Sequence, residues 1–172
     1  MGYVHDTHMQ QVISPLNFHC VTGTWVEAAG NVAHTVVKQK AAAAETATVT
    51  IPLLVPGNEN GGGNDGKGSM IASVGVDYEI LTAAATSITA TMWKIARGAD
   101  DAVAVATQVT VTQDLVAATT AAEVDQHNLL ITVTTPEYID DDDYWFVELA
   151  CVCAATTVLE FLGAQVNYTF RV

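Results

Sequence analysis

Positive charge is scarce in this sequence. Six Lys and Arg residues stand against 19 Asp and Glu residues, so the formal net charge of the 172-residue chain is −13. Lys and Arg supply most of the affinity of proteins for nucleic-acid phosphates, and an anionic membrane surface repels an acidic chain. We therefore expect neither nucleic acid nor membrane among the partners of this acidic protein.

Long hydrophobic runs are also missing. A membrane-spanning helix needs about 18 or more consecutive apolar residues, and polar residues interrupt every such stretch here. The beginning of the chain, "MGYVHDTHMQQVISP", has neither the basic segment nor the apolar core of a secretory signal. The sequence thus predicts a chain without a signal peptide, made in the cytoplasm.

Cysteine is sparse, with only Cys20, Cys151 and Cys153 present. An odd number does not suit a disulfide framework, and residues two apart on one strand bridge each other only with strain. A chain of this length also buries enough surface to fold without a disulfide or metal. We expect all three to be small buried thiols in a reducing compartment.

Alternation of apolar and polar residues, with a period of two, dominates the rest of the chain. This period is typical of half-buried β-strands, and residues 41–44 are too short a run of alanine to predict a helix. The segments with strand character are 18–27, 32–40, 46–55, 69–81, 86–96, 102–112, 128–135, 144–153 and 156–170.

The parity of the apolar residues predicts which face of each strand meets the core. The predicted core residues are Met70, Ala72, Val74, Val76, Tyr78 and Ile80, then Ile88, Ala90 and Met92, then Leu129, Ile131 and Val133, then Trp145, Val147, Leu149, Cys151 and Cys153. In the last strand Leu159 and Phe161 share one parity, whereas Val166 and Tyr168 share the other. The switch falls at Gly163, where we expect a β-bulge.

Many short strands, frequent turn signals and no helix predict an all-β fold. The expected architecture is an antiparallel β-sandwich, with a jelly roll favoured and an immunoglobulin-like sandwich as the alternative. We expect an N-terminal arm over residues 1–17 and a single β-sandwich domain over residues 18–172. That domain contains a Gly-rich loop at 56–69, which lacks the spacing of a phosphate-binding loop.

No motif for catalysis is present. None of His5, His8, His19, His34 and His127 accompanies a nucleophile elbow, and "HDTH" at residues 5–8 lacks the paired soft ligands of a zinc site. The sequence therefore assigns no catalytic, cofactor-binding or metal-binding residue and predicts a protein that is not an enzyme.

Four consecutive aspartates, Asp140, Asp141, Asp142 and Asp143, precede the aromatic segment "YWFVELA". Aspartate favours turns because its side chain bonds the nearby backbone, so we expect a solvated turn that leads into a core strand. The run lacks the glycine and the distal glutamate of an EF-hand loop. A calcium site shared with other loops is the alternative.

Strand faces opposite the predicted core are rich in Thr and Ala, as at Thr48, Thr50, Thr110 and Thr112. Charged residues make up 15% of the chain, whereas soluble domains usually have about 25%. This composition suits a subunit that packs against copies of itself or against a lattice.

The C-terminal two-thirds resembles the jelly-roll structural proteins of tailed phages, including head decoration or cement proteins. The resemblance is carried by "SMIASVGVDYEI", "TSITATMWKI", "LLITVTTPEYIDDDDYWFVELA" and "VLEFLGAQVNYTF". It implies a virion component, made in the host cytoplasm, that stabilises or covers a viral capsid without catalysis. The implied partners are the chain itself, as a homotrimer, and the major capsid protein or another virion protein.

The alternative function is a carbohydrate- or receptor-binding β-sandwich, such as a phage fibre tip or an extracellular binding domain. Trp25, Trp93 and Trp145 are the candidate sugar platforms. Trp145 shares the parity of core residues, whereas Trp93 lies opposite Met92 in parity and is the better exposed candidate.

Overall fold

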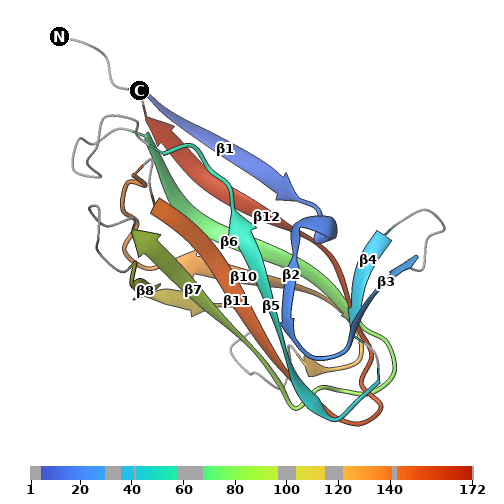
Figure 1. Cartoon of the computed structure of the whole chain (residues 1–172). Coiled ribbons are helices and arrows are strands. Elements are labelled where there is room, and N and C mark those ends of the chain that lie inside the picture. The colour runs from blue at the N-terminus through green and yellow to red at the C-terminus, as the bar shows by residue number, and fades with distance from the viewer. Residues whose placement is uncertain are drawn as a thin grey trace.

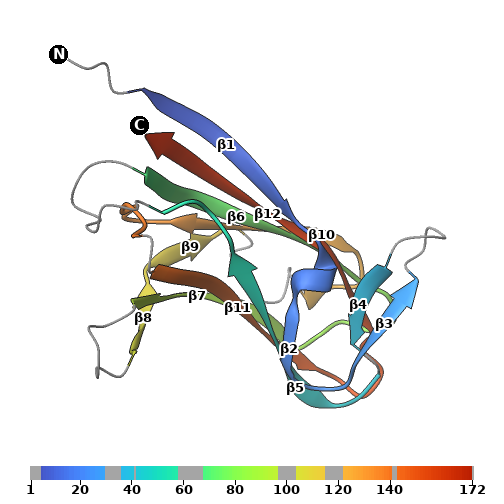
Figure 2. The ribbon, with the colours of Figure 1, turned by 45° about the horizontal axis from the view of Figure 1, so that its top comes forward.

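The computed structural model contains two antiparallel sheets packed face to face (Figures 1 and 2). It describes residues 5–29, 36–40, 42–57, 68–96, 104–114, 122–140 and 143–171. The strands are β1 (Asp6–Ile13), β2 (His19–Thr22), β3 (Trp25–Ala29), β4 (Val36–Lys40), β5 (Glu45–Leu53), β6 (Gly68–Ile80), β7 (Ser87–Ala96), β8 (Ala106–Val109), β9 (Val111–Gln113), β10 (Gln126–Val133), β11 (Asp143–Cys153) and β12 (Leu159–Arg171). The all-β, antiparallel sandwich predicted from the sequence is confirmed.

Sheet A has seven strands and sheet B has five. The order in sheet A is β3-β4-β12-β6-β10-β9, with β1 also paired to β12, and the order in sheet B is β2-β5-β11-β7-β8. The long strands alternate between the sheets along the chain: β5, β7 and β11 belong to sheet B, and β6, β10 and β12 belong to sheet A. The jelly-roll connectivity stays a prediction at this point.

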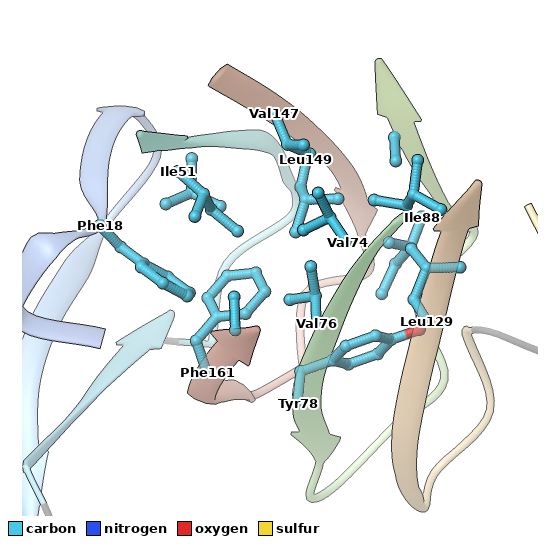
Figure 3. Close-up of a cluster of buried hydrophobic side chains, with 14 of the residues drawn as sticks. Phe18, Ile51, Val74, Val76, Tyr78, Ile88, Leu129, Val147, Leu149 and Phe161 are labelled. Atoms are coloured by element: carbon cyan, nitrogen blue, oxygen red, sulfur yellow. The ribbon is translucent and has the colours of Figure 1, made fainter. Parts of the chain in front are cut away.

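The core fills the space between the inner faces of the two sheets, as Figure 3 shows. Phe161 is fully buried and contacts three rings, with centroid distances of 5.5 Å to Phe18, 5.6 Å to Trp25 and 6.2 Å to Tyr78. Burial of one large apolar side chain stabilises the folded state by about 1.5–3 kcal/mol relative to leaving it exposed. Phe18, the C-cap of η1 (Pro15–Asn17), therefore packs on β12 through Phe161, which in turn contacts Tyr78 on β6.

The predicted core parity is confirmed for β7, β10 and β11, whose alternate apolar residues are buried. In β6 the prediction is right for Val74 and the alternate residues after it, but wrong for Met70 and Ala72. Ile71 is buried instead, at 1% exposure, whereas Ala72 is exposed. The register with β12 shifts between Asn167 and Tyr168, so one residue of β6 has no partner there and the facing reverses.

Gly163 lies at the other irregularity of this strand pair, where the register shifts between Phe161 and Gly163, and the predicted bulge is confirmed. Its φ of 154° is a conformation that residues with a side chain rarely adopt. Because of the bulge, Leu159 and Phe161 before it and Ala164 and later alternate residues after it all face the core.

Residues 6–13 form β1, which pairs with β12 along its whole length. The sequence predicts an arm there and no strand, because "DTHMQQVI" has no apolar alternation. The predicted single strand at 102–112 is wrong: β8 belongs to sheet B and β9 to sheet A, with the change of sheet at Thr110.

Some sequence predictions fall where the structure gives no description. Most of the Gly-rich loop, residues 58–67, lies outside the described residues, as do 32–35 of an expected strand and Asp141 and Asp142 of the aspartate run. In the described ranges, no helix has the length and apolar character needed to span a membrane.

Candidate interaction surface

The outward residues of sheet B form a surface almost without charge, which we call the sheet B outer face. On β5, β7 and β11 its residues alternate with buried ones, and those of β2 and β8 lie beside them in the strand register. They are His19, Thr22, Thr46, Thr48, Thr50, Pro52, Ser87, Thr89, Thr91, Trp93, Ile95, Ala106, Gln108, Tyr144, Phe146, Glu148, Ala150 and Val152. Glu148 is the single Asp, Glu, Lys or Arg among them, in a chain with 19 acidic residues.

One end of the sheet B outer face is aromatic. Phe146 lies between Pro52 on β5 and Trp93 on β7, and Tyr144, next along this face of β11, lies opposite Ile95. Tyr144 is 62% exposed, and the other four side chains are half-buried. Neighbours of this kind on one face of a sheet contact each other and form a continuous apolar surface. The other end consists of Thr, Ser, Ala and Val.

The outer face of sheet A has a different character, because its polar side chains bond to one another. The donor–acceptor pairs are Asn128 Nδ2 to Asp77 Oδ1 at 2.5 Å, Gln10 Nε2 to Gln165 Oε1 at 2.6 Å and Asn167 Nδ2 to Ser73 Oγ at 3.2 Å. A polar outer face of this kind is typical of an antiparallel sheet that has one side on the core and the other in water. Sheet B therefore presents the unusual surface of the sandwich.

The aspartate run leads directly into a core strand. The Asp143 N–H donates to the Asp140 carbonyl at 3.2 Å, the Asp140 N–H donates to Asp143 Oδ2 at 3.4 Å, and β11 begins at Asp143. β11 lies at the centre of sheet B, between β5 and β7. The predicted turn before a core strand is confirmed for these two residues, but the expected solvation is wrong for Asp143, whose side chain is mostly buried.

The Asp143 carboxylate is mostly buried and lies near one positive charge, that of Lys94. Its side chain is 7% exposed, and Lys94 Nζ lies 4.0 Å from Oδ2 while it also bonds Glu137 at 2.7 Å. Burial raises the pKa of Asp143, and the bonds to the backbone and the charge of Lys94 oppose that rise. The Asp143 carboxylate therefore interacts with Asp140 and Lys94 at the beginning of β11.

The sequence's other polar candidates take part in structure. Asp6 forms an ion pair with Arg171, and His8 Nδ1 lies 3.3 Å from Thr169 Oγ1. His127 packs on Tyr78, with 5.2 Å between the ring centroids, and its Nε2 lies 2.9 Å from the Glu123 carbonyl. Across the parts of the chain that the structure describes, no group of three His, Cys, Asp or Glu side chains is placed to hold a metal ion. His34 lies outside those parts.

Cys151 and Cys153 are buried in the core, as predicted, and Cys153 Sγ donates to the Cys151 carbonyl at 3.7 Å. Cys20 is only half-buried, which differs from the expectation, because it lies on β2 at the end of sheet B. All three residues are thiols.

The three tryptophans have different surroundings. Trp145 is 4% exposed and belongs to the core. Trp25 stacks on Phe161 and donates from Nε1 to the Thr22 carbonyl at 2.7 Å. Trp93 lies on the sheet B outer face, as predicted. The sequence does not predict the aromatic neighbours of Trp93. Phe146 is more than fifty positions away in the chain and lies beside Trp93 only because β11 pairs with β7.

One surface hollow of about 280 Å³ lies beside β1, and another of about 290 Å³ lies near β8 and β9. Both are smaller than usual ligand pockets of roughly 300–1,000 Å³. Comparison of the chain with known protein families, curated proteins and solved structures finds no match. The sheet B outer face is therefore the feature on which a functional proposal can rest.

Proposed function

We propose that this chain is a non-enzymatic virion structural subunit of the capsid decoration or cement type. In this proposal the sheet B outer face contacts other copies of the chain and the capsid lattice. The observation that supports it is the near absence of charge from that face, in a chain whose net charge is −13.

Electrostatics favours this face over the others as a contact between acidic copies. Like charges that meet across an interface are destabilising, and removing an unpaired charge from water costs several kcal/mol. The Thr, Ala and Ser side chains carry no such cost. The aromatic end adds a favourable contribution of about 25 cal/mol for each Å² of apolar surface removed from water.

The strand order supports a jelly roll, the fold expected from the resemblance to phage decoration proteins. Two four-stranded sets, β4-β12-β6-β10 and β5-β11-β7-β8, face each other, and the chain crosses between the sheets at nearly every step from β4 to β12. This is the pattern of two interlocked Greek keys. The homotrimer is carried over from the resemblance and is part of the proposal.

Mass spectrometry of purified virions tests the proposal. Particles made by the genome that encodes this chain are purified by density gradient and denatured, and their proteins are quantified. We expect the chain in amounts comparable with the major capsid protein, and its gene beside the capsid gene. Particles without the chain would contradict the virion role.

A carbohydrate-binding module is the second candidate, and the row of Phe146, Trp93 and nearby Tyr144 supports it. Flat aromatic surfaces bind sugar rings through their apolar faces. A glycan array probed with the purified chain tests this function. It predicts binding that is lost in Trp93→Ala and kept in Leu130→Ala, a matched change on the outer face of sheet A. The absence of binding by the unaltered chain would remove this candidate.

A further inference from the structure

β1 is an edge strand of sheet A. It pairs with β12 over eight residues in an uninterrupted register. In Figures 1 and 2 it forms the outermost ribbon on its side of sheet A. No described residue pairs with its other edge. An open edge of this kind presents a row of backbone N–H and C=O groups that can pair with another chain.

The other terminal strands of the described sheets are shorter. β2 and β8 have four residues each, β3 has five and β9 has three. β2 is also irregular, with a register shift between Cys20 and Thr22. Short and bulged edge strands are the usual protection against pairing between molecules. β1 has neither protection.

Side chains cover parts of the remaining open edges. The Leu130 N–H on β10 donates to Asp114 Oδ1 at 3.0 Å. The Ala90 carbonyl on β7 accepts a bond from Gln113 Nε2 at 2.9 Å. These side chains occupy backbone groups to which another strand would otherwise bind. Among the described residues, the side-chain hydrogen bonds that involve β1 join side chains to side chains, and none occupies a backbone group of its outer edge.

The charge pattern of β1 suits contact with another acidic chain. Its only acidic residue, Asp6, lies at one end and is neutralised by the ion pair with Arg171. No lysine, the residue that most often protects an edge, is present. Val12 is 76% exposed and Met9 is 44% exposed, so the strand also offers apolar side chains to a partner.

We infer that β1 is an intermolecular pairing edge, to which a second copy of this chain adds its own β1 in antiparallel orientation. The two sheets A then form one continuous sheet across a two-fold axis. The edge is self-complementary, because an antiparallel arrangement places the two Asp6 side chains at opposite ends. This inference concerns sheet A and does not rest on the virion role or on the sheet B outer face.

The symmetry defines which side chains meet. A two-fold axis perpendicular to the sheet places one residue of β1 opposite its own copy, and Gln10 lies near the middle of the strand. With Gln10 at the axis, His8 of one chain lies opposite Val12 of the other. The exposed Val12 side chain then gains a cross-strand neighbour, in the manner of paired residues within a sheet.

Disulfide trapping tests this arrangement. Gln10→Cys and Met9→Cys, which cover the two central registers, are made in a Cys20→Ser background and oxidised mildly. The control is Gln126→Cys, an exposed glutamine of sheet A on β10. We expect a covalent dimer from at least one β1 variant and mainly monomer from the control. If neither β1 variant exceeds the control, the inference is wrong.

Hydrogen exchange gives a second readout that needs no substitution. The amides of the peptide that spans β1 are expected to exchange more slowly as protein concentration rises, whereas those of β10 keep one rate. A β1 exchange rate that is independent of concentration would overturn the inference. The variant Phe146→Lys, altered on the sheet B outer face, is expected to keep the concentration dependence.

Discussion

Asp6 on β1 and Arg171 on β12 form a two-point ion pair between the first and last strands of the chain, which are neighbours in sheet A. Arg171 Nε lies 2.5 Å from Asp6 Oδ1, and Arg171 Nη2 lies 2.8 Å from Oδ2. The Arg171 guanidinium also lies over the Tyr138 ring, 5.6 Å from its centroid. The hydrogen bond from Arg171 is the main cause of a pKa of Asp6 below its usual value of 3.8.

The variant Asp6→Asn is therefore expected to loosen β1. A carboxyl whose pKa is lowered by folding stabilises the fold above its unfolded pKa, and this contribution is lost as pH falls through the folded pKa. At pH 7 and low protein concentration we expect faster amide exchange in β1 of the variant than of the wild type. The difference should shrink at high salt and vanish in acid below the lowered pKa of Asp6. Glu148→Gln, the control, should leave β1 exchange unchanged.

The raised pKa of Asp143 predicts a pH dependence of stability opposite to that of Asp6. Burial raises the pKa of Asp143, so its ionised form destabilises the fold at neutral pH, and this effect is relieved as pH falls through the raised folded pKa toward 3.8. Asp143→Asn is expected to raise the melting temperature at pH 7 and to match the wild type below pH 3.8. A variant that melts below the wild type at pH 7 would show that the Lys94 interaction outweighs burial. Glu137→Gln, which removes an exposed partner of Lys94, should have little effect.

The bulge at Gly163 predicts a position-specific cost of adding one methyl group. A Cβ there would lie 3.4 Å from the Ile13 carbonyl oxygen, and the φ of 154° is strained for any residue with a side chain. We expect Gly163→Ala to lower the free energy of unfolding by about 1–3 kcal/mol. Gly75→Ala is the control, because its Cβ would meet the flexible Gln165 side chain at 3.2 Å. Equal losses in urea denaturation of the two variants would contradict this explanation.

Alternation predicts the long central strands because each of them has one buried and one exposed face. The same rule locates the bulge at Gly163, where glycine marks the change of parity. It fails at Ala72, where the facing also reverses but no glycine marks the change. It fails again at Thr110, because alternation continues through residues 102–112 while tertiary packing divides them between two sheets.

β1 and the sheet B outer face depend on strand pairing, which a single sequence does not show. "DTHMQQVI" becomes a strand because β12 provides a pairing edge, and its own side chains give no signal. The sequence shows that Thr and Ala are frequent opposite the core. It does not show that Pro52, Trp93 and Phe146 lie in one row, since they come from three separate segments.

Sedimentation velocity of two matched variants tests most directly whether the sheet B outer face is an assembly surface. Ala150 lies on the central strand of that face, between Thr48 and Thr89, and Thr132 is an exposed residue on the outer face of sheet A. We predict that the wild type and Thr132→Glu sediment as the same oligomer. Ala150→Glu should sediment as a smaller species with an unchanged circular dichroism spectrum. A wild type that is monomeric at every concentration, or an Ala150→Glu variant of full oligomer size, would contradict the account.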